Sequence, residues 1–478
     1  MWIWLAAAAA AAGAEGVLRV GPQGDFPSVS RALEAARDGE TILVEPGYYR
    51  ERLTVDRPVR LVGRPGAVLD GGGEGDVVTI RADGVELSGF VIRGSGRRLW
   101  KDEAGIKVLA GGTVIAGNVL EDVLFGILVI GADGQAIREN RITGLVDLLE
   151  HDRGDGIRLY NSNGNLVEGN RIVKSRDGIY VEFSSGNRIA GNRVEGARIG
   201  LHYMYSDDNL FEENLFTDCG VASAIMYSRG VVVRRNVFAR SRGYGAYGLF
   251  LKEARSAQVE ANLVAANQTG LSLDFAIAST FRGNLVVAND VAVRVLASSV
   301  DSRFYDNAFV ANGSGVYLSP GRHTLQWDDG VGRGNFWSDY RGYDLDADGV
   351  GDVPFDASEL FGYLVESYPE LKVLFQSPAV MAVAAAERAF PLFPRPSAQD
   401  RFPLMRMPEA AQAWVHEPAS LAAAEFSRLS RASGGSGPQG AAAWPATVSA
   451  VAAAAGLWAA AVALRPVAPW RRREGARQ

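Results

Sequence analysis

Residues 164–216 repeat one short phrase, reading GNLVEGNRIVKSRDGIYVEFSSGNRIAGNRVEGARIGLHYMYSDDNLFEENLF. An asparagine returns in this stretch every 22 residues, at Asn170, Asn192 and Asn214. The same marker asparagine continues along the chain with a few longer intervals, at Asn118, Asn140, Asn170, Asn192, Asn214, Asn236, Asn262, Asn284, Asn307 and Asn335. A period near 22 residues indicates a repeat architecture whose longer intervals are loops.

Each repeat contains segments with the pattern of a strand. The segments GIYVEF and GLSLDF alternate apolar and polar residues, as a strand with one buried face does. Asparagine and glycine fill the bends, and no interval is long enough for a crossover helix. The leucine-dense consensus of a leucine-rich horseshoe is absent. The sequence therefore predicts an all-β fold, a right-handed parallel β-helix with coils of about 22 residues.

Composition sets broad limits on the chain. It has 478 residues, is 47% hydrophobic and carries a net charge of −6, so it can bury a large core and has no nucleic-acid footprint. The single cysteine, Cys219, excludes an intramolecular disulfide and is interpreted as a half-buried thiol.

The first 117 residues are predicted to contain an export signal and the N-terminal cap of the solenoid. Residues 1–14 have the apolar stretch and small residues of a secretory signal, although only the free amino group supplies positive charge. Residues 15–117 are the entrance, cap and first coils. Ser28 is expected to begin a short helix, Val29 to Arg37, that covers the open end of the first coil. Residues 118–340 are the β-helix repeats.

An acidic loop, residues 341–356, follows the repeats. Four carboxylates lie at positions 1, 3, 5 and 9 of the segment DLDADGVGD, with glycine at position 6, and they are Asp344, Asp346, Asp348 and Asp352. This is the first part of a calcium-binding loop, but the glutamate of position 12 is missing. The sequence predicts a calcium-type site here, and a solvated acidic turn is the alternative.

The remainder of the chain changes composition three times. Residues 357–429 form a helical and proline-rich tail, and residues 430–445 are a flexible linker. Residues 446–464 are uncharged and just long enough to span a membrane, although a helix lying on the surface is the alternative. The arginines in residues 465–478 predict a cytoplasmic C-terminus. We therefore expect a periplasmic protein tethered to the inner membrane.

The wall of the solenoid carries the candidate metal ligands. Stacked coils bring equal offsets from the marker into one column, with neighbours about 4.8 Å apart. Residues 10 and 12 positions after the marker are predicted to face outward, so His202 and Met204 share a face and Met226 lies beside Met204. Imidazole with thioether sulfur favours Cu(I). The residues alone favour a metal-free contact surface, and a copper site formed by His202, Met204 and Met226 is the second interpretation, which the family resemblance described below strengthens.

Aromatic residues surround this face. Tyr180 lies ten positions after its marker, and Tyr205, Tyr227 and Phe275 lie thirteen positions after theirs. Large aromatic side chains that stay on a surface suit protein interfaces. These four residues are predicted to contact a partner.

A carbohydrate-active β-helix enzyme is the main alternative in a different class. Such enzymes use carboxylates with arginine, lysine or histidine on one outer face. The candidates here are Asp152, Asp155 and Arg153 in an inserted loop, Asp177, and Glu182 near Lys252. None forms a recognisable acid–base pair, and His151 is interpreted as a surface histidine. We expect no enzymatic activity.

Several phrases resemble one family. The residues that carry the resemblance are RGDGIRLYNSNGNLVEGN (153–170), RDGIYVEFSSGNRIAGN (176–192), LHYMYSDDN (201–209), IMYSRGVVVRRN (225–236) and GNFWSDYRGYDLDADGVGDVPF (334–355). They are similar to the NosD family of nitrous oxide reductase maturation proteins. The resemblance extends from about Val17 through the segment SPAVMAVAAAERAFPLFPRP.

The resemblance implies an exported, non-catalytic accessory factor. Proteins of this family dock with the membrane and ATPase subunits of an ABC transporter. They take part with a copper chaperone in delivering copper to nitrous oxide reductase and assembling its copper–sulfide centre. His202, Met204 and Met226 lie in the family's matching phrases, and residues 377–408 resemble the part used at the transporter. The linker and anchor after residue 430 depart from the family pattern. A passive scaffold without metal stays an alternative.

Overall fold

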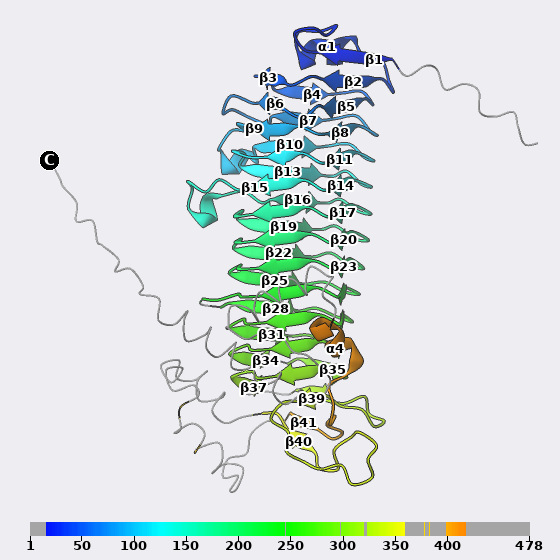
Figure 1. Cartoon of the computed structure of the whole chain (residues 1–478), viewed down its shortest axis with the longest axis vertical. Coiled ribbons are helices and arrows are strands. Elements are labelled where there is room, and N and C mark those ends of the chain that lie inside the picture. The colour runs from blue at the N-terminus through cyan, green and yellow to red at the C-terminus, as the bar shows by residue number, and fades with distance from the viewer. Residues whose placement is uncertain are drawn as a thin grey trace, which may run out of the picture. The chain divides into compact units, whose positions relative to one another are not determined.

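The computed structural model describes residues 16–243, 245–296, 298–319, 323–358, 377, 382 and 398–416 (Figure 1). The chain divides into two compact units, Met1–Ala413 and Trp414–Gln478. Within the first unit the coils stack from β1 to β39, in the order of the chain, and each coil adds one strand to each of three sheets.

Three parallel sheets contain nearly all strands of the described residues, and we name them A, B and C. Sheet A contains β1 Val17–Val20, β2 Thr41–Val44, β5 Arg60–Gly63, β8 Glu86–Ser88, β11 Val114–Ala116, β14 Ala136–Arg138, β17 Leu166–Glu168, β20 Arg188–Ala190, β23 Leu210–Glu212, β26 Val232–Arg234, β29 Gln258–Glu260, β32 Thr280–Arg282, β35 Val300–Tyr305 and β38 Thr324–Gln326. Sheet B contains β3 Gly47–Tyr49, β6 Ala67–Asp70, β9 Val91–Arg93, β12 Val119–Leu120, β15 Arg141–Thr143, β18 Arg171–Val173, β21 Arg193–Glu195, β24 Leu215–Thr217, β27 Val237–Ala239, β30 Leu263–Ala265, β33 Leu285–Val287, β36 Ala308–Val310 and β39 Phe336–Trp337. Sheet C contains β4 Leu53–Val55, β7 Val78–Ile80, β10 Ala104–Val108, β13 Phe125–Ile130, β16 Ile157–Tyr160, β19 Asp177–Glu182, β22 Ile199–Met204, β25 Val221–Met226, β28 Tyr247–Lys252, β31 Thr269–Asp274, β34 Val291–Leu296 and β37 Ser314–Leu318.

A few short elements complete the described chain. They are α1 Val29–Ala35, the 3₁₀ turns η1 Leu99–Lys101 and η2 Glu150–Asp152, the strands β40 Phe355–Asp356 and β41 Gln399–Asp400, and the helix α4 Glu409–His416. The predicted all-β, right-handed parallel β-helix is confirmed. Figure 1 shows that the longer intervals form side loops, such as the one that carries η2 after β15.

The marker asparagines form a continuous hydrogen-bonded ladder inside the solenoid. Asn192 is fully buried, and its backbone N–H and its amide Nδ2 both donate to Oδ1 of Asn214, each at 3.0 Å. Nδ2 of Asn192 also donates to the carbonyl of Val167 at 2.8 Å. Because every buried polar group of a rung finds a partner, repeating the residue repeats the coil.

Gly178, eight residues after the marker Asn170, lies in close contact with its neighbours. A Cβ atom on Gly178 would lie 2.3 Å from Cγ1 of Val194 and 2.5 Å from the carbonyl oxygen of Gly200. A side chain at Gly178 would therefore displace the neighbouring coil, and the equivalent positions of other coils hold only glycine or alanine, as at Ala222 and Ala292.

The N-terminal end is closed as predicted. The hydroxyl of Ser28 accepts a hydrogen bond from the backbone N–H of Arg31 and caps α1, which ends at Ala35 rather than Arg37. The helix buries Val29, Ala32 and Leu33 against the first coil. Its apolar face therefore covers the strand edges and core that the first coil would otherwise expose.

The other end is closed by a residue from far along the chain. Oδ2 of Asp400 accepts hydrogen bonds from the backbone N–H of Asn335 at 2.7 Å and from Nε1 of Trp337 at 2.9 Å. Asp400 lies on β41, which pairs with β40 in antiparallel orientation. Asp400 thus takes the place of the next ladder rung.

Several predicted segments lie wholly or largely outside the described residues. They are the signal 1–14, most of the tail 357–429, the linker 430–445, the anchor 446–464 and the basic end 465–478. Among the residues that the structure describes, no helix is long and apolar enough to cross a membrane.

Candidate metal and partner-binding face

The outward side of β19, β22 and β25, here called the His–Met face, carries the predicted copper ligands. Leu201, Tyr203 and Ile225 point into the solenoid and are fully buried. The alternating residues His202, Met204 and Met226 are half-buried on the outside. Strand alternation therefore places one imidazole and two thioethers on the same wall.

The register brings the two sulfurs onto neighbouring strands. Met204 is the direct partner of Met226 in the pairing of β22 with β25. Directly opposite residues of adjacent strands lie about 4.8 Å apart. The Tyr180 hydroxyl donates to Sδ of Met204 at 3.8 Å. Burial raises the pKa of the Tyr180 phenol above its ordinary value, so this hydroxyl stays protonated and polar at neutral pH.

His202 is held by a buried carboxylate. Its Nδ1 lies 2.7 Å from Oδ2 of Asp177, whose side chain is 1% exposed. Burial pushes the pKa of Asp177 upward, but hydrogen bonds from His202 and Arg198 outweigh burial and hold that pKa below its usual range. An ionised carboxylate can only accept, so Nδ1 of the imidazole carries the hydrogen.

An aromatic ring fixes the orientation of the imidazole. The rings of Tyr180 and His202 are stacked with their centroids 4.4 Å apart and an interplanar angle of 14°. The guanidinium of Arg158 lies 4.9 Å from the centroid of Tyr180. His202 is therefore fixed by a hydrogen bond at its edge and a ring on one face.

Two carboxylates on this wall are buried and paired with arginines, which the sequence did not predict. Asp155 and Asp177 occupy the same column one coil apart, and each receives two hydrogen bonds from an arginine 21 residues later, Arg176 and Arg198 respectively. Burial, with the nearby charge of Asp177, raises the pKa of Asp155 to about 6. The 21-residue spacing, one residue less than a coil, is the sequence signal that could have revealed the pairs.

The predicted partner-contact residues fall into two groups. Tyr205 and Tyr227 are stacked with centroids 4.8 Å apart, and Phe183 continues the stack at 5.3 Å from Tyr205. Their backbones have φ near 50°, an uncommon conformation for aromatic residues. Phe275 has the same backbone conformation two coils after Tyr227, and Glu253 occupies the equivalent position in the coil between them. Tyr180 instead belongs with His202, so the four residues do not form one continuous stack.

The acidic loop gathers three of its four predicted carboxylates. Asp344, Asp346 and Asp348 each place one oxygen within 4.8 Å of the others. Oδ2 of Asp344 accepts from the N–H of Gly349 at 3.0 Å, whereas Asp352 accepts from the N–H of Leu345 at 2.8 Å. The calcium site stays a prediction, which the melting temperature with and without added Ca²⁺ tests.

Of the enzymatic candidates, only Asp155 and Asp177 are neighbours, one coil apart in the same column. In sheet C, Glu182, Met204, Met226 and Lys252 follow one another in register, so the predicted proximity of Glu182 and Lys252 is wrong. Three strand spacings, about 14 Å, separate them. Asp155 and Asp177 are each held in an ion pair with an arginine, and Asp177 also contacts His202.

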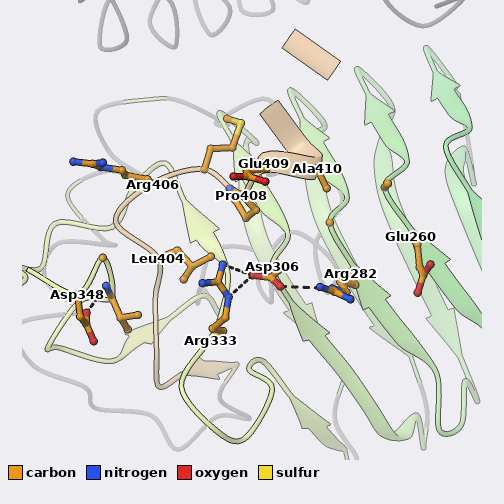
Figure 2. A pocket seen from close by; sticks show the side chains of 15 residues that line it. Glu260, Arg282, Asp306, Arg333, Asp348, Leu404, Arg406, Pro408, Glu409 and Ala410 are labelled. Carbon is orange, nitrogen blue, oxygen red and sulfur yellow. Dashed lines mark hydrogen bonds and ion pairs between the residues drawn. The ribbon is translucent and has the colours of Figure 1, made fainter. Parts of the chain in front are cut away.

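A pocket of 660 Å³ lies between the last coils and the returning segment before α4 (Figure 2). Figure 2 shows Arg282 and Arg333 on either side of Asp306, at 3.6 Å and 2.7 Å. The two arginines share this one carboxylate, which compensates one of their two positive charges. None of the predicted copper ligands lines it.

The remaining soft or titratable candidates do not join the His–Met face. Cys219 is buried, and burial raises the pKa of its thiol to about 12, so the thiol is protonated at neutral pH. His151 is exposed on η2, with Nε2 3.7 Å from Asp152. His151 is a surface histidine as predicted, whereas Cys219 is fully buried rather than half-buried.

The fold and this wall together define a class: a parallel β-helix solenoid that presents soft donor atoms and stacked aromatic rings on one side. A family model described as "Periplasmic copper-binding protein (NosD)" matches residues 136–342. A Pseudomonas aeruginosa protein named "Probable ABC transporter binding protein NosD" is 42% identical over 394 residues, which cover 79% of this chain and 91% of that protein. A protein of the same name from Stutzerimonas stutzeri is 36% identical over 400 residues, 80% of this chain and 91% of its own length. The chain belongs to the NosD family.

The chain is also similar to solved structures, at TM-scores below 0.5. The A-module of a mannuronan C-5 epimerase from Azotobacter vinelandii has a TM-score of 0.46 and 16% identity, covering 65% of this chain and 94% of that one. The catalytic unit of an α-1,3-glucanase from Streptomyces thermodiastaticus has a TM-score of 0.49 and 16% identity, covering 68% and 73%. Likeness at this level carries no argument about activity.

Proposed function

We propose that this chain is an exported, non-catalytic assembly factor that carries Cu(I) on the His–Met face as cargo. In this role it works with a membrane ABC transporter in the maturation of nitrous oxide reductase. The family description supports periplasmic copper binding, and the names of the relatives support an ABC transporter partner. The proposal includes nitrous oxide reductase, its copper–sulfide centre and a copper chaperone because the sequence resemblance implies them.

One observation carries the copper proposal. Met204 and Met226 are direct neighbours on the outer wall, and His202 lies two residues from Met204 on the same strand. Methionine is usually core filler, yet two of the six methionines stand together here beside an oriented imidazole. Two thioethers and one imidazole form a donor set that suits Cu(I) and binds hard cations poorly.

The partner contact follows from the aromatic residues beside these ligands. Tyr205 and Tyr227 come directly after Met204 and Met226, so their stacked rings border the proposed metal site. A protein that covers these rings would also cover the metal and exclude water during transfer. Tyr180 and Phe275 would extend this contact along the wall.

Location and docking complete the proposal. We infer export by residues 1–14, tethering to the inner membrane by residues 446–464, and transporter contact through residues 377–408. A tether would raise the effective concentration of the chain near its membrane partner. Cell fractionation of the full chain and of a chain ending at residue 430 tests the tether, because only the full chain should sediment with membranes.

The copper proposal is tested by titrating the purified full chain with Cu(I), under reducing conditions, against a chromophoric chelator. We expect one tightly bound Cu(I) per chain. The double variant Met204→Leu/Met226→Leu should bind it at least about 100-fold more weakly, because leucine keeps the shape and removes both sulfur ligands.

A matched control is available in the same chain. Met405→Leu/Met407→Leu removes two methionines near α4, outside the His–Met face, and should leave Cu(I) affinity unchanged. Equal affinity in all three proteins would contradict the proposal, as would absence of Cu(I) binding. In that case a metal-free scaffold fits the aromatic wall better, and turnover of uronate polymers would instead indicate an enzyme.

A further inference from the structure

We propose that Asp177 is a positioning residue that selects the tautomer of His202, so that Nε2 of the imidazole is the metal-binding atom. The identity of the bound metal rests on the proposed function above. The selection of the tautomer does not, because it follows from contacts within the chain.

The first support is the geometry of the carboxylate. Oδ2 of Asp177 receives Nη2 of Arg198 and Nδ1 of His202, both at 2.7 Å, and Oδ1 receives Nε of Arg198 at 2.9 Å. Three charge-assisted contacts saturate most of the acceptor capacity of a buried carboxylate. The group has no hydrogen to offer, so Nδ1 must be the donor.

The second support is a comparison with the preceding coil. Asp155 occupies the same column and makes the same two-bond contact with Arg176, at 3.1 Å for each hydrogen bond. Among the residues that the structure describes, no histidine contacts Asp155. The two-bond arginine contact therefore forms in this fold without a histidine, and the imidazole at Asp177 is an additional partner of the buried carboxylate.

The third support is the confinement of the ring. Tyr180 stacks on the imidazole, and the side chain of His202 is only 13% exposed. A ring held at Nδ1 and covered on one face has little freedom to turn. Its second nitrogen is then the ring atom left available to a ligand.

The chemical consequence is a ligand prepared before metal arrives. Hydrogen bonding of Nδ1–H to a carboxylate raises the basicity of the opposite nitrogen, and loss of such a partner weakens metal binding about 10- to 100-fold. Asp177 would therefore strengthen the imidazole without touching the metal.

The tautomer is tested first in the metal-free wild-type chain, with ¹⁵N-labelled histidine. At a pH where the ring is neutral, the ¹⁵N shifts of His202 should report protonated Nδ1 and bare Nε2. The chain has four histidines, so His202→Gln assigns the signal. A protonated Nε2 would overturn the proposal with no variant of Asp177 required.

The variant Asp177→Asn then tests the effect on binding. We expect the ¹⁵N pattern to lose its preference for Nδ1–H and Cu(I) affinity to fall about 10- to 100-fold. The control Asp155→Asn removes the equivalent buried charge and should change neither readout.

The outcomes separate the two proposals. If wild type does not bind Cu(I) but its tautomer is as stated, the proposed function fails and the positioning role stands. If wild type binds Cu(I) and Asp177→Asn binds it equally well, the positioning role fails alone. A melting temperature for each variant shows whether lost binding reflects lost folding.

Discussion

Two columns of residues run along the same coils, one inside the solenoid and one on the wall of sheet C. The inner column repeats asparagine from Asn118 to Asn335, and each of these asparagines donates hydrogen bonds to the asparagine of the next coil. The outer column changes at each step, with Arg158, Tyr180, His202, Ala224 and Phe250 in consecutive coils. Repetition in the inner column serves assembly, because each rung must bond to an identical neighbour. Variation in the outer column is free to serve binding, because backbone pairing alone holds the strands together.

The sharpest test of this contrast removes one inner rung. Asn214→Ala should lower the free energy of unfolding by about 3–5 kcal/mol, because two donors of Asn192 and the carbonyl of Ile189 lose their partner. Urea unfolding measures it. The exposed Asn163→Ala should cost about 1 kcal/mol or less. Equal costs at the two positions would show that burial of the inner asparagine adds nothing to the stability of the solenoid.

The final rung predicts a pH dependence of stability. Burial raises the pKa of Asp400 to about 6, whereas the unfolded chain has a pKa of about 3.9. The folded state therefore binds the proton of the Asp400 carboxyl more tightly than the unfolded chain does. The stabilisation that this proton gives is present below the pKa of the unfolded chain and is lost as the pH rises through 6. Relative to Asp400→Asn, wild type should lose about 2 kcal/mol of unfolding free energy between pH 4.5 and pH 7.5.

Chemical denaturation at several pH values gives this difference directly. Asp339→Asn, at an exposed carboxylate, serves as the control and should follow wild type throughout. A constant difference between wild type and Asp400→Asn across this range would show that the ladder ends without a buried titrating group.

The outer column predicts effects on binding with small effects on folding. His202→Ala should reduce Cu(I) affinity about tenfold or more, because it removes the only nitrogen ligand of the proposed set. His151→Ala, on the exposed turn η2, should leave affinity unchanged. Competition titration measures both. A large loss of stability in His202→Ala with unchanged affinity would assign the residue to the fold rather than to the site.

The smallest effect is expected at the aromatic corner. Tyr205→Gly relieves the strain of φ 48° and loses stacking on Phe183 and Tyr227, two effects of about 1 kcal/mol each and of opposite sign. Stability by urea unfolding should change by less than about 1 kcal/mol. Tyr203→Ala, at a fully buried position two residues earlier, should cost about 3–5 kcal/mol.

The sequence predicts the solenoid well because its main determinant is a single residue type at a fixed interval. It also predicts the cap at Ser28 and the side of β22 on which His202 and Met204 lie, since both depend on local periodicity. It does not reveal Asp177 as the partner of His202, because that contact joins offsets 7 and 10 of different coils. Asp400 was equally hidden, because no repeat connects it with Asn335, 65 residues earlier. Contacts between unlike positions need coordinates.

The direction of the ladder has a consequence for how such chains can change in length. Each marker asparagine accepts hydrogen bonds from the coil before it and donates hydrogen bonds to the coil after it. Every internal coil therefore makes the same hydrogen bonds with both of its neighbours. A whole coil can therefore be gained or lost in the middle without leaving an unmatched joint. Only the last rung is special, because it needs a group that accepts and does not donate, and the carboxylate of Asp400 provides it. The length of the wall can thus drift during evolution while both ends stay the same.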